Sequence, residues 1–122
     1  MVNLKKRFLF VFSCAPHASL RIQEHMDMLL TAAAFEQSVG VLFIDDGVML
    51  LTAKQNPEVI GCRDIAAILN SLPIYDVEDL YVEEESFGER GLQLDAVQIP
   101  VSNVSRSNLG PLLGSYDLVV NC

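Results

Sequence analysis

The cysteines are the residues of this chain best suited to nucleophilic or sulfur chemistry. There are three, Cys14, Cys62 and Cys122. Their odd number and the lack of C-x-x-C spacing predict neither a disulfide framework nor a zinc ribbon. His17 lies three residues after Cys14, and a nearby imidazole could favour the thiolate that sulfur transfer needs. Cys14 and His17 are therefore the candidate catalytic pair, although free cysteines are often buried and inert, which makes packing the simpler interpretation.

Cys62 raises the same question, because it precedes a predicted helix whose N-terminal dipole would favour a thiolate. Packing is again the interpretation we favour. Asp45 and Asp46 could supply oxygen ligands to a hard cation, but neighbouring side chains on an extended segment point in opposite directions. We expect these two carboxylates to cap the following helical turn, and we predict no metal site.

Other catalytic and cofactor patterns are missing from the sequence. Ser13 and His17 do not make a hydrolase triad, because the G-x-S-x-G elbow is absent. Neither G-x-G-x-x-G nor G-x-x-x-x-G-K-[ST] occurs, and the loop after the first predicted strand has no glycine. A flavodoxin-like module that binds a nucleotide or flavin is therefore disfavoured, and we expect no cofactor.

The elements that position these residues follow from hydrophobic periodicity. Continuous apolar runs predict buried strands, and apolar residues at helical spacing predict amphipathic helices. Gly110 and Pro111 fall inside the last predicted helix, so we expect it to be short, kinked or late in starting. Strands are predicted at 7–13, 39–44, 80–82, 96–101 and 116–121, and helices or helical turns at 19–35, 48–51, 64–72, 84–92 and 102–113.

This alternation predicts an α/β fold of three layers, α/β/α, around a five-stranded, mostly parallel sheet. We expect a single domain over residues 1–122. Ligands and chemistry gather beyond the carboxyl ends of strands in such sheets. Those positions are residues 13–19, 45–48 and 83–86 and the turn around Ser102.

Composition excludes several classes of function. The formal net charge of -8 opposes direct nucleic-acid binding. Apolar residues make up 51% of the chain, yet no run reaches the ~20 residues of a membrane helix, and no signal-peptide cleavage site follows the first apolar segment. We expect a cytoplasmic, oligomeric protein without a membrane partner, and a solvated face, rather than a docking patch, for the acidic stretch 76–85.

Six segments of the chain carry a resemblance to a known family. In order they are F-V-F-S-C-A-P-H at 10–17, F-I-D-D-G-V at 43–48, R-D-I-A at 63–66, I-Y-D-V-E at 74–78, S-F-G-E-R-G-L at 86–92 and Y-D-L-V at 116–119. Together they resemble the DsrE/DsrF/DsrH-like sulfur-relay family, closest to its DsrF/TusC branch. The resemblance covers the whole chain.

The resemblance implies a subunit of a heterohexamer with TusB-like and TusD-like chains, or the corresponding subunits of sulfur oxidisers. In the tRNA-modifying version, persulfide sulfur passes from a desulfurase through a small carrier to the TusD-like subunit. It then reaches a thiouridylase that makes 2-thiouridine at the wobble position. Thiolate exchange explains why a persulfide suits such a relay.

The family's active cysteine follows the strand that corresponds to residues 80–82, where this chain has Glu83. A carboxylate cannot carry sulfane sulfur, so the resemblance implies a non-catalytic structural subunit with no catalytic residue to transfer. Two alternatives stay open. Cys14 could be a persulfide carrier in its own right, or the chain could be the DsrF subunit of dissimilatory sulfur oxidation.

Overall fold

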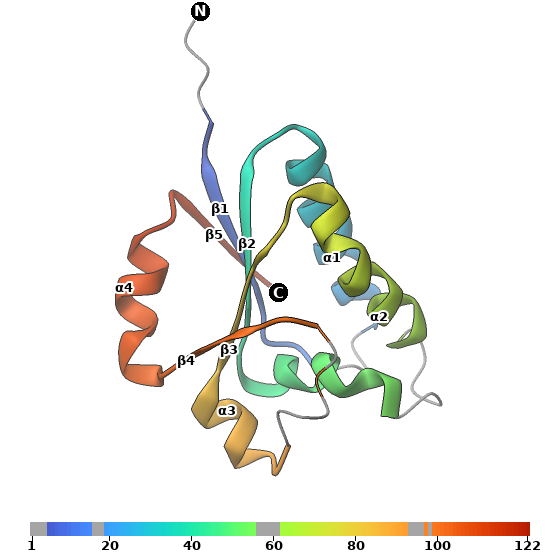
Figure 1. Cartoon of the computed structure of the whole chain (residues 1–122), viewed down its shortest axis with the longest axis vertical. Helices are drawn as coiled ribbons and strands as arrows, with labels where there is room; N and C mark the ends of the chain where they lie inside the picture. Colours follow the sequence, from blue (N-terminus) through green and yellow to red (C-terminus); the bar gives the residue numbers. More distant parts are fainter. Residues whose placement is uncertain (1–4, 16–18, 56–61, 93–96, 98) are drawn as a thin grey trace, which may run out of the picture.

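Five parallel strands form the centre of the protein (Figure 1). The computed structural model describes residues 5–15, 19–55, 62–92, 97 and 99–122. The strand order is β4-β3-β2-β1-β5, so the strands run outward from β1 to β4 and the chain then returns to place β5 on the other side of β1. The strands are β1 (Arg7–Phe12), β2 (Ser38–Phe43), β3 (Asp79–Glu83), β4 (Ser102–Val104) and β5 (Leu118–Asn121).

Helices cover both faces of this sheet, which confirms the predicted three-layer α/β fold. Figure 1 shows α1 and α2 on one side, α4 on the other, and α3 beyond the end of β3. The α-helices are α1 (Ser19–Ala34), α2 (Cys62–Ser71), α3 (Glu84–Glu89) and α4 (Leu109–Gly114), and the 3-10 segments are η1 (Asp45–Gln55), η2 (Leu72–Tyr75) and η4 (Arg106–Asn108). None of the helices in the described part of the chain is long and apolar enough to cross a membrane.

The alternation of side chains along β1 explains the two unequal cores. Phe10 and Phe12 point into the larger core with α1, while Leu9 and Val11 point into a smaller one with Tyr116. Successive residues of a strand face opposite sides of a sheet, so a continuous apolar run is what a strand covered on both faces requires. The larger core also buries Ile22, Met26, Leu29, Val41, Phe43, Leu69, Leu72, Leu80, Val82 and Phe87.

Two glycines allow close approaches around the central strands β1 and β2. A Cβ on Gly47 would overlap the carbonyl oxygen of Phe12, so the turn after β2 lies directly on the end of β1. A Cβ on Gly40 would overlap the ring hydroxyl of Tyr116 on the α4 side. Gly47 also donates a backbone hydrogen bond to Ile44 at 2.9 Å, and Ile44 donates to Phe12 at 3.1 Å. The ends of β1 and β2 are thus joined by backbone contacts.

The fourth strand lies later than the sequence predicted. The expected strand at 96–101 is wrong, because β4 spans Ser102–Val104 and pairs with Tyr81, Val82 and Glu83. Residues 96 and 98 lie outside the described residues. Val97, Ile99 and Val101 pack half-buried against the larger core outside any strand, and Pro100 lacks the amide hydrogen that a ladder needs. The apolar pattern there reflects burial of a connecting segment.

The last helix starts late, as the Gly110-Pro111 pair predicted. The expected start at residue 102 is replaced by η4 and then α4, which begins at Leu109. Pro111 falls in the first turn of α4, where a missing amide hydrogen costs nothing. The helix predicted at 64–72 ends one residue earlier than expected, since α2 ends at Ser71 and Pro73 lies in the first turn of η2.

Candidate functional site

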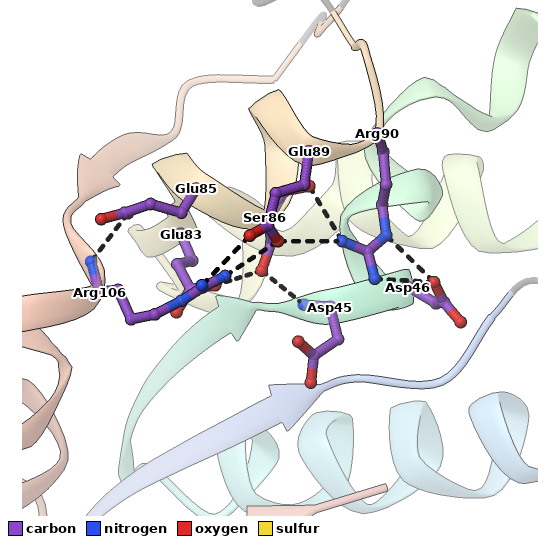
Figure 2. Close-up of polar contacts among 8 residues, drawn as sticks. All are labelled: Asp45, Asp46, Glu83, Glu85, Ser86, Glu89, Arg90 and Arg106. Atoms are coloured by element: carbon purple, nitrogen blue, oxygen red, sulfur yellow. Dashed lines mark hydrogen bonds and ion pairs between the residues drawn. The ribbon is translucent and has the colours of Figure 1, made fainter.

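The carboxyl end of β3 holds a buried carboxylate. Glu83 is the last residue of β3, and its side chain is only 4% exposed. It lies beside the start of α3 and faces the segment that follows β4 (Figure 2). A buried carboxylate is costly unless it is paired and hydrogen-bonded, so its partners decide what this site can do.

Ser86 and Arg106 satisfy the Glu83 carboxylate. The Ser86 hydroxyl, which is fully buried, donates a short hydrogen bond to Oε1 of Glu83 and accepts one from the backbone amide of Asp45 at 2.9 Å. Nη2 of Arg106 donates to the same Glu83 oxygen at 3.0 Å. The site therefore joins three segments, namely the end of β3, the turn after β2 and the segment after β4 (Figure 2).

Arg106 is anchored at three further points. Its Nη1 and Nη2 donate to the two carboxylate oxygens of Glu89 at 3.2 and 3.0 Å. Its backbone amide donates to Oε1 of Glu85 at 2.8 Å. This forked geometry suits guanidinium–carboxylate pairing and fixes the segment after β4 to α3.

The local charges keep Glu83 ionised. Burial acts to raise the pKa of Glu83, but hydrogen bonds from Arg106 and Ser86 outweigh it, so the pKa of Glu83 lies below its ordinary value. Hydrogen bonding to Arg106 likewise lowers the pKa of Glu89. Hydrogen bonds to both carboxylates raise the pKa of Arg106, which is a permanent cation at neutral pH.

Asp46 makes a long-range contact where the sequence predicted a local cap. Its Oδ1 accepts hydrogen bonds from Nε and Nη2 of Arg90, at 3.0 and 2.9 Å, across 44 residues of chain. Arg90 also donates from Nη1 to the carbonyl oxygen of Ser86 at 3.1 Å. Asp46 and Arg90 thus connect η1 to the end of α3. Asp45 has a left-handed backbone, with φ of 50°, which an aspartate tolerates.

The charged groups at the end of β3 are engaged in pairing with one another. Glu83 uses its carboxylate on Arg106 and Ser86, and neither a thiol nor an imidazole belongs to the network drawn in Figure 2. Within the described residues no group of three or more His, Cys, Asp or Glu side chains could hold a metal ion. This network of Asp46, Glu83, Glu85, Ser86, Glu89, Arg90 and Arg106 is called the ion-pair cluster below.

Of the candidate pair Cys14 and His17, only Cys14 belongs to the described residues. His17 lies outside the described residues, as does the side chain of Cys62. Cys14 is half-buried after β1. Burial raises the pKa of its thiol, the Cys122 thiol raises it further, and Arg21 offsets only part of the shift. Cys14 is therefore a poorer thiolate than an exposed cysteine.

Two residues that the sequence analysis did not single out contribute to this edge of the sheet. Arg106 lies 23 residues beyond Glu83 and begins η4, two residues after the end of β4, a position that the wrongly predicted strand at 96–101 did not indicate. His25 is 4% exposed and packs edge-on against the rings of Phe10 and Phe12. Its spacing from Ile22, Met26 and Leu29 on the apolar face of α1 is the sequence signal that could have placed it in the core.

The fold and the site define a doubly wound α/β domain with a salt-bridged carboxylate at the end of its third strand. The DsrE/DsrF-like family model matches residues 6–121, and the chain belongs to this family. A protein of Aliivibrio fischeri described as a TusC homolog is 32% identical over 114 residues, which cover 93% of this chain and 97% of that protein.

A solved structure shows the same fold. The crystal structure of the YchN protein from E. coli superposes with a TM-score of 0.69 and covers 98% of this chain and 100% of that one. The sequence identity is 17%, so this similarity concerns the fold alone.

Proposed function

We propose that this chain is a non-catalytic structural subunit of a cytoplasmic sulfur-relay complex of the TusBCD/DsrEFH type, acting in 2-thiouridine synthesis at the tRNA wobble position. Its partners in this proposal are TusB-like and TusD-like chains. A small sulfur carrier and a thiouridylase act beside them, and this chain makes no direct contact with nucleic acid. Membership of the DsrE/DsrF-like family and the TusC-homolog relative support a sulfur-relay subunit.

The observation that carries the non-catalytic role is the state of Glu83. Sulfur-carrying relatives, as the sequence resemblance implies, place the active cysteine at the end of the strand corresponding to β3. Here that position has a buried carboxylate bound to Arg106 and Ser86. Because oxygen cannot hold sulfane sulfur and the partners hold the carboxylate in place, this site stabilises the loops around it.

Exposed apolar side chains support a role in assembly. Phe35 is 73% exposed and Ile74 is 82% exposed, and Leu20, Met28, Tyr75, Leu118 and Val119 also expose large apolar surfaces. Leu118 and Val119 lie on β5, which is an edge strand of the sheet. Subunit interfaces would remove this surface from water.

Replacing all three cysteines tests the proposal. The triple variant Cys14→Ser, Cys62→Ser, Cys122→Ser is co-expressed with the TusB-like and TusD-like chains, and native mass measurement checks the assembly. Sulfur transfer from a desulfurase and carrier to the thiouridylase should stay within about twofold of the unmodified complex, because no thiol of this chain takes part. A loss of more than about tenfold in an intact assembly contradicts the proposal.

A matched variant identifies the subunit that carries sulfur. Serine at the active cysteine of the TusD-like chain should abolish transfer in the same assay. The alternative in which Cys14 is a persulfide carrier predicts one added sulfur on Cys14 when the chain alone meets desulfurase and cysteine. The raised pKa of Cys14 opposes that outcome. The DsrF alternative predicts co-assembly with the subunits of a sulfur oxidiser.

A further inference from the structure

Two cysteines from opposite ends of the chain meet at the carboxyl edge of the sheet. In the β1–β5 pair, Val11 lies opposite Asn121, so Cys122 directly follows the end of the ladder. The backbone amide of Cys122 donates to the carbonyl oxygen of Val11 at 3.2 Å. The Ser13 hydroxyl donates to the backbone oxygen of Cys122 at 2.9 Å. Cys122 is therefore held between residues 11 and 13, immediately before Cys14.

The two thiols share one environment. Both cysteines are half-buried and pack against the larger hydrophobic core. An interaction with the Cys122 thiol helps to raise the pKa of Cys14. Ser13 and Cys122 are 109 residues apart in the chain, so only the pairing of β1 with β5 brings these groups together.

A depression on the surface gives small molecules access to Cys122. It has a volume of about 460 Å³, and Arg21, His25 and Cys122 are among the residues that line it. Arg21 also interacts with the Cys14 thiol and offers a positive charge to an anionic reagent. Nε2 of His25 is buried without a hydrogen-bond partner. The depression therefore combines a thiol and a cation, with the buried ring of His25 as part of its wall.

We propose that Cys14 and Cys122 form a dithiol modification site that closes to an intramolecular disulfide by exchange with a low-molecular-weight disulfide. The thiolate of Cys122 attacks one sulfur of the reagent, which forms a mixed disulfide and releases one reagent thiol. The Cys14 sulfur then attacks the Cys122 sulfur and expels the second reagent thiol. The two cysteines lose two electrons and two protons, and the small disulfide is reduced to two thiols.

The order of attack follows from access to the depression and from the raised pKa of the Cys14 thiol. Cys122 lines the depression, while burial and its neighbour raise the pKa of the Cys14 thiol, so Cys122 is the entering group. Cys14 then acts at short range, where proximity compensates for its small thiolate fraction.

The same geometry makes either cysteine a poor long-lived sulfur carrier. A persulfide on Cys14 would be attacked by Cys122 at the Cys14 sulfur, giving the Cys14–Cys122 disulfide and releasing hydrogen sulfide. The inference is independent of the proposed relay function, because it concerns the chemistry of this chain alone.

The test uses oxidised glutathione as the small disulfide. The reduced full-length chain is incubated with it under native conditions, free thiols are blocked by alkylation, and peptides are mapped by mass spectrometry. We expect the peptides of Cys14 and Cys122 to be linked, at least about tenfold more often than either is linked to Cys62. Linkage that is equally frequent among all three cysteines overturns the proposal, as does separate glutathione adduction of Cys14 and Cys122.

Three variants and a denaturant sharpen the result. Cys62→Ser should leave the Cys14–Cys122 disulfide unchanged. Cys14→Ser should instead trap a stable glutathione adduct on Cys122, and Cys122→Ser should slow modification of Cys14. In concentrated urea the preference for the Cys14–Cys122 pair should disappear, because the pairing of β1 with β5 is lost. A preference that persists in urea contradicts the structural origin of the site.

Discussion

The ion-pair cluster at the end of β3 and the two cysteines at the ends of β1 and β5 lie on the same edge of the sheet. They differ in how far their side chains are engaged with one another. At β3, the ion-pair cluster commits its oxygens and guanidinium groups to one another. At β1 and β5, Cys14 and Cys122 are unoxidised thiols, and Cys122 lines a depression together with Arg21 and His25. Both regions occupy the place where ligands usually bind in open α/β sheets. The comparison teaches that similar positions at strand ends can hold very different groups, since local pairing engages the polar side chains at β3, whereas two thiols lie at β1 and β5.

The largest effect on stability is expected where the turn after β2 lies on the end of β1, between the two regions. Gly47→Ala places a methyl group on the carbonyl oxygen of Phe12, which cannot move without shifting β1. We expect a loss of about 3 kcal/mol in the free energy of unfolding, measured by urea denaturation. Gly88→Ala is the matched control, since nothing lies within 4 Å of its added methyl group. An equal loss in both variants would contradict the assigned contact.

Glu83→Gln should weaken the ion-pair cluster by an intermediate amount. The amide keeps the shape of the side chain but loses the charge that Arg106 binds at 3.0 Å. Because Arg106 is 48% exposed, solvent screens part of this interaction, and we expect a loss of about 1–2 kcal/mol at pH 7.

The pH dependence of this variant gives a second measurement. The pKa of Glu83 is lower in the folded protein, so its contribution is present above its ordinary value of 4.5 and is lost as the pH falls through the folded pKa. The stability difference between wild type and Glu83→Gln should therefore shrink in acid. A difference that stays constant from pH 7 to pH 3 would show that Glu83 acts through shape.

The smallest effect on stability is expected from His25, which lines the same depression as Cys122. Burial lowers the pKa of His25 below its ordinary value of 6.5, because the charged ring is disfavoured between Phe10 and Phe12. Its contribution to stability is present above pH 6.5 and is lost as the pH falls, since the unfolded chain then binds the proton more readily. His25→Phe should change stability at pH 7 by less than about 1 kcal/mol.

The variant should also flatten the dependence of unfolding free energy on pH between 7 and 5. An unchanged slope in His25→Phe would exclude His25 as the titrating group. The free energy of unfolding should therefore fall in two different pH windows. Protonation of His25 acts below the ordinary pKa of histidine, and protonation of Glu83 acts below that of glutamate.

Glu83 and Cys14 could be placed at strand ends because each follows an apolar run, a long one at 7–13 for Cys14 and a short one at 80–82 for Glu83. It did not locate Arg106, because the apolar residues before β4 pack as a connecting segment and resemble a strand. The spacing of His25 from its apolar neighbours on α1 indicates burial, but a single polar residue on such a face gives no sign of a particular role. The meeting of Cys14 and Cys122 depends on β5 lying beside β1, and strand order is a property of the packed chain that periodicity does not encode.

The adjacency of β1 and β5 also has a consequence for synthesis on the ribosome. After residues 7–104 have emerged, four strands can pair, yet β1 still has an open flank because its second neighbour spans Leu118–Asn121. Until then the nascent polypeptide presents an unprotected backbone ladder beside Phe8 and Phe10. Pairing on this flank of β1 must therefore await the emergence of Leu118–Asn121, long after its pairing with β2 has become possible.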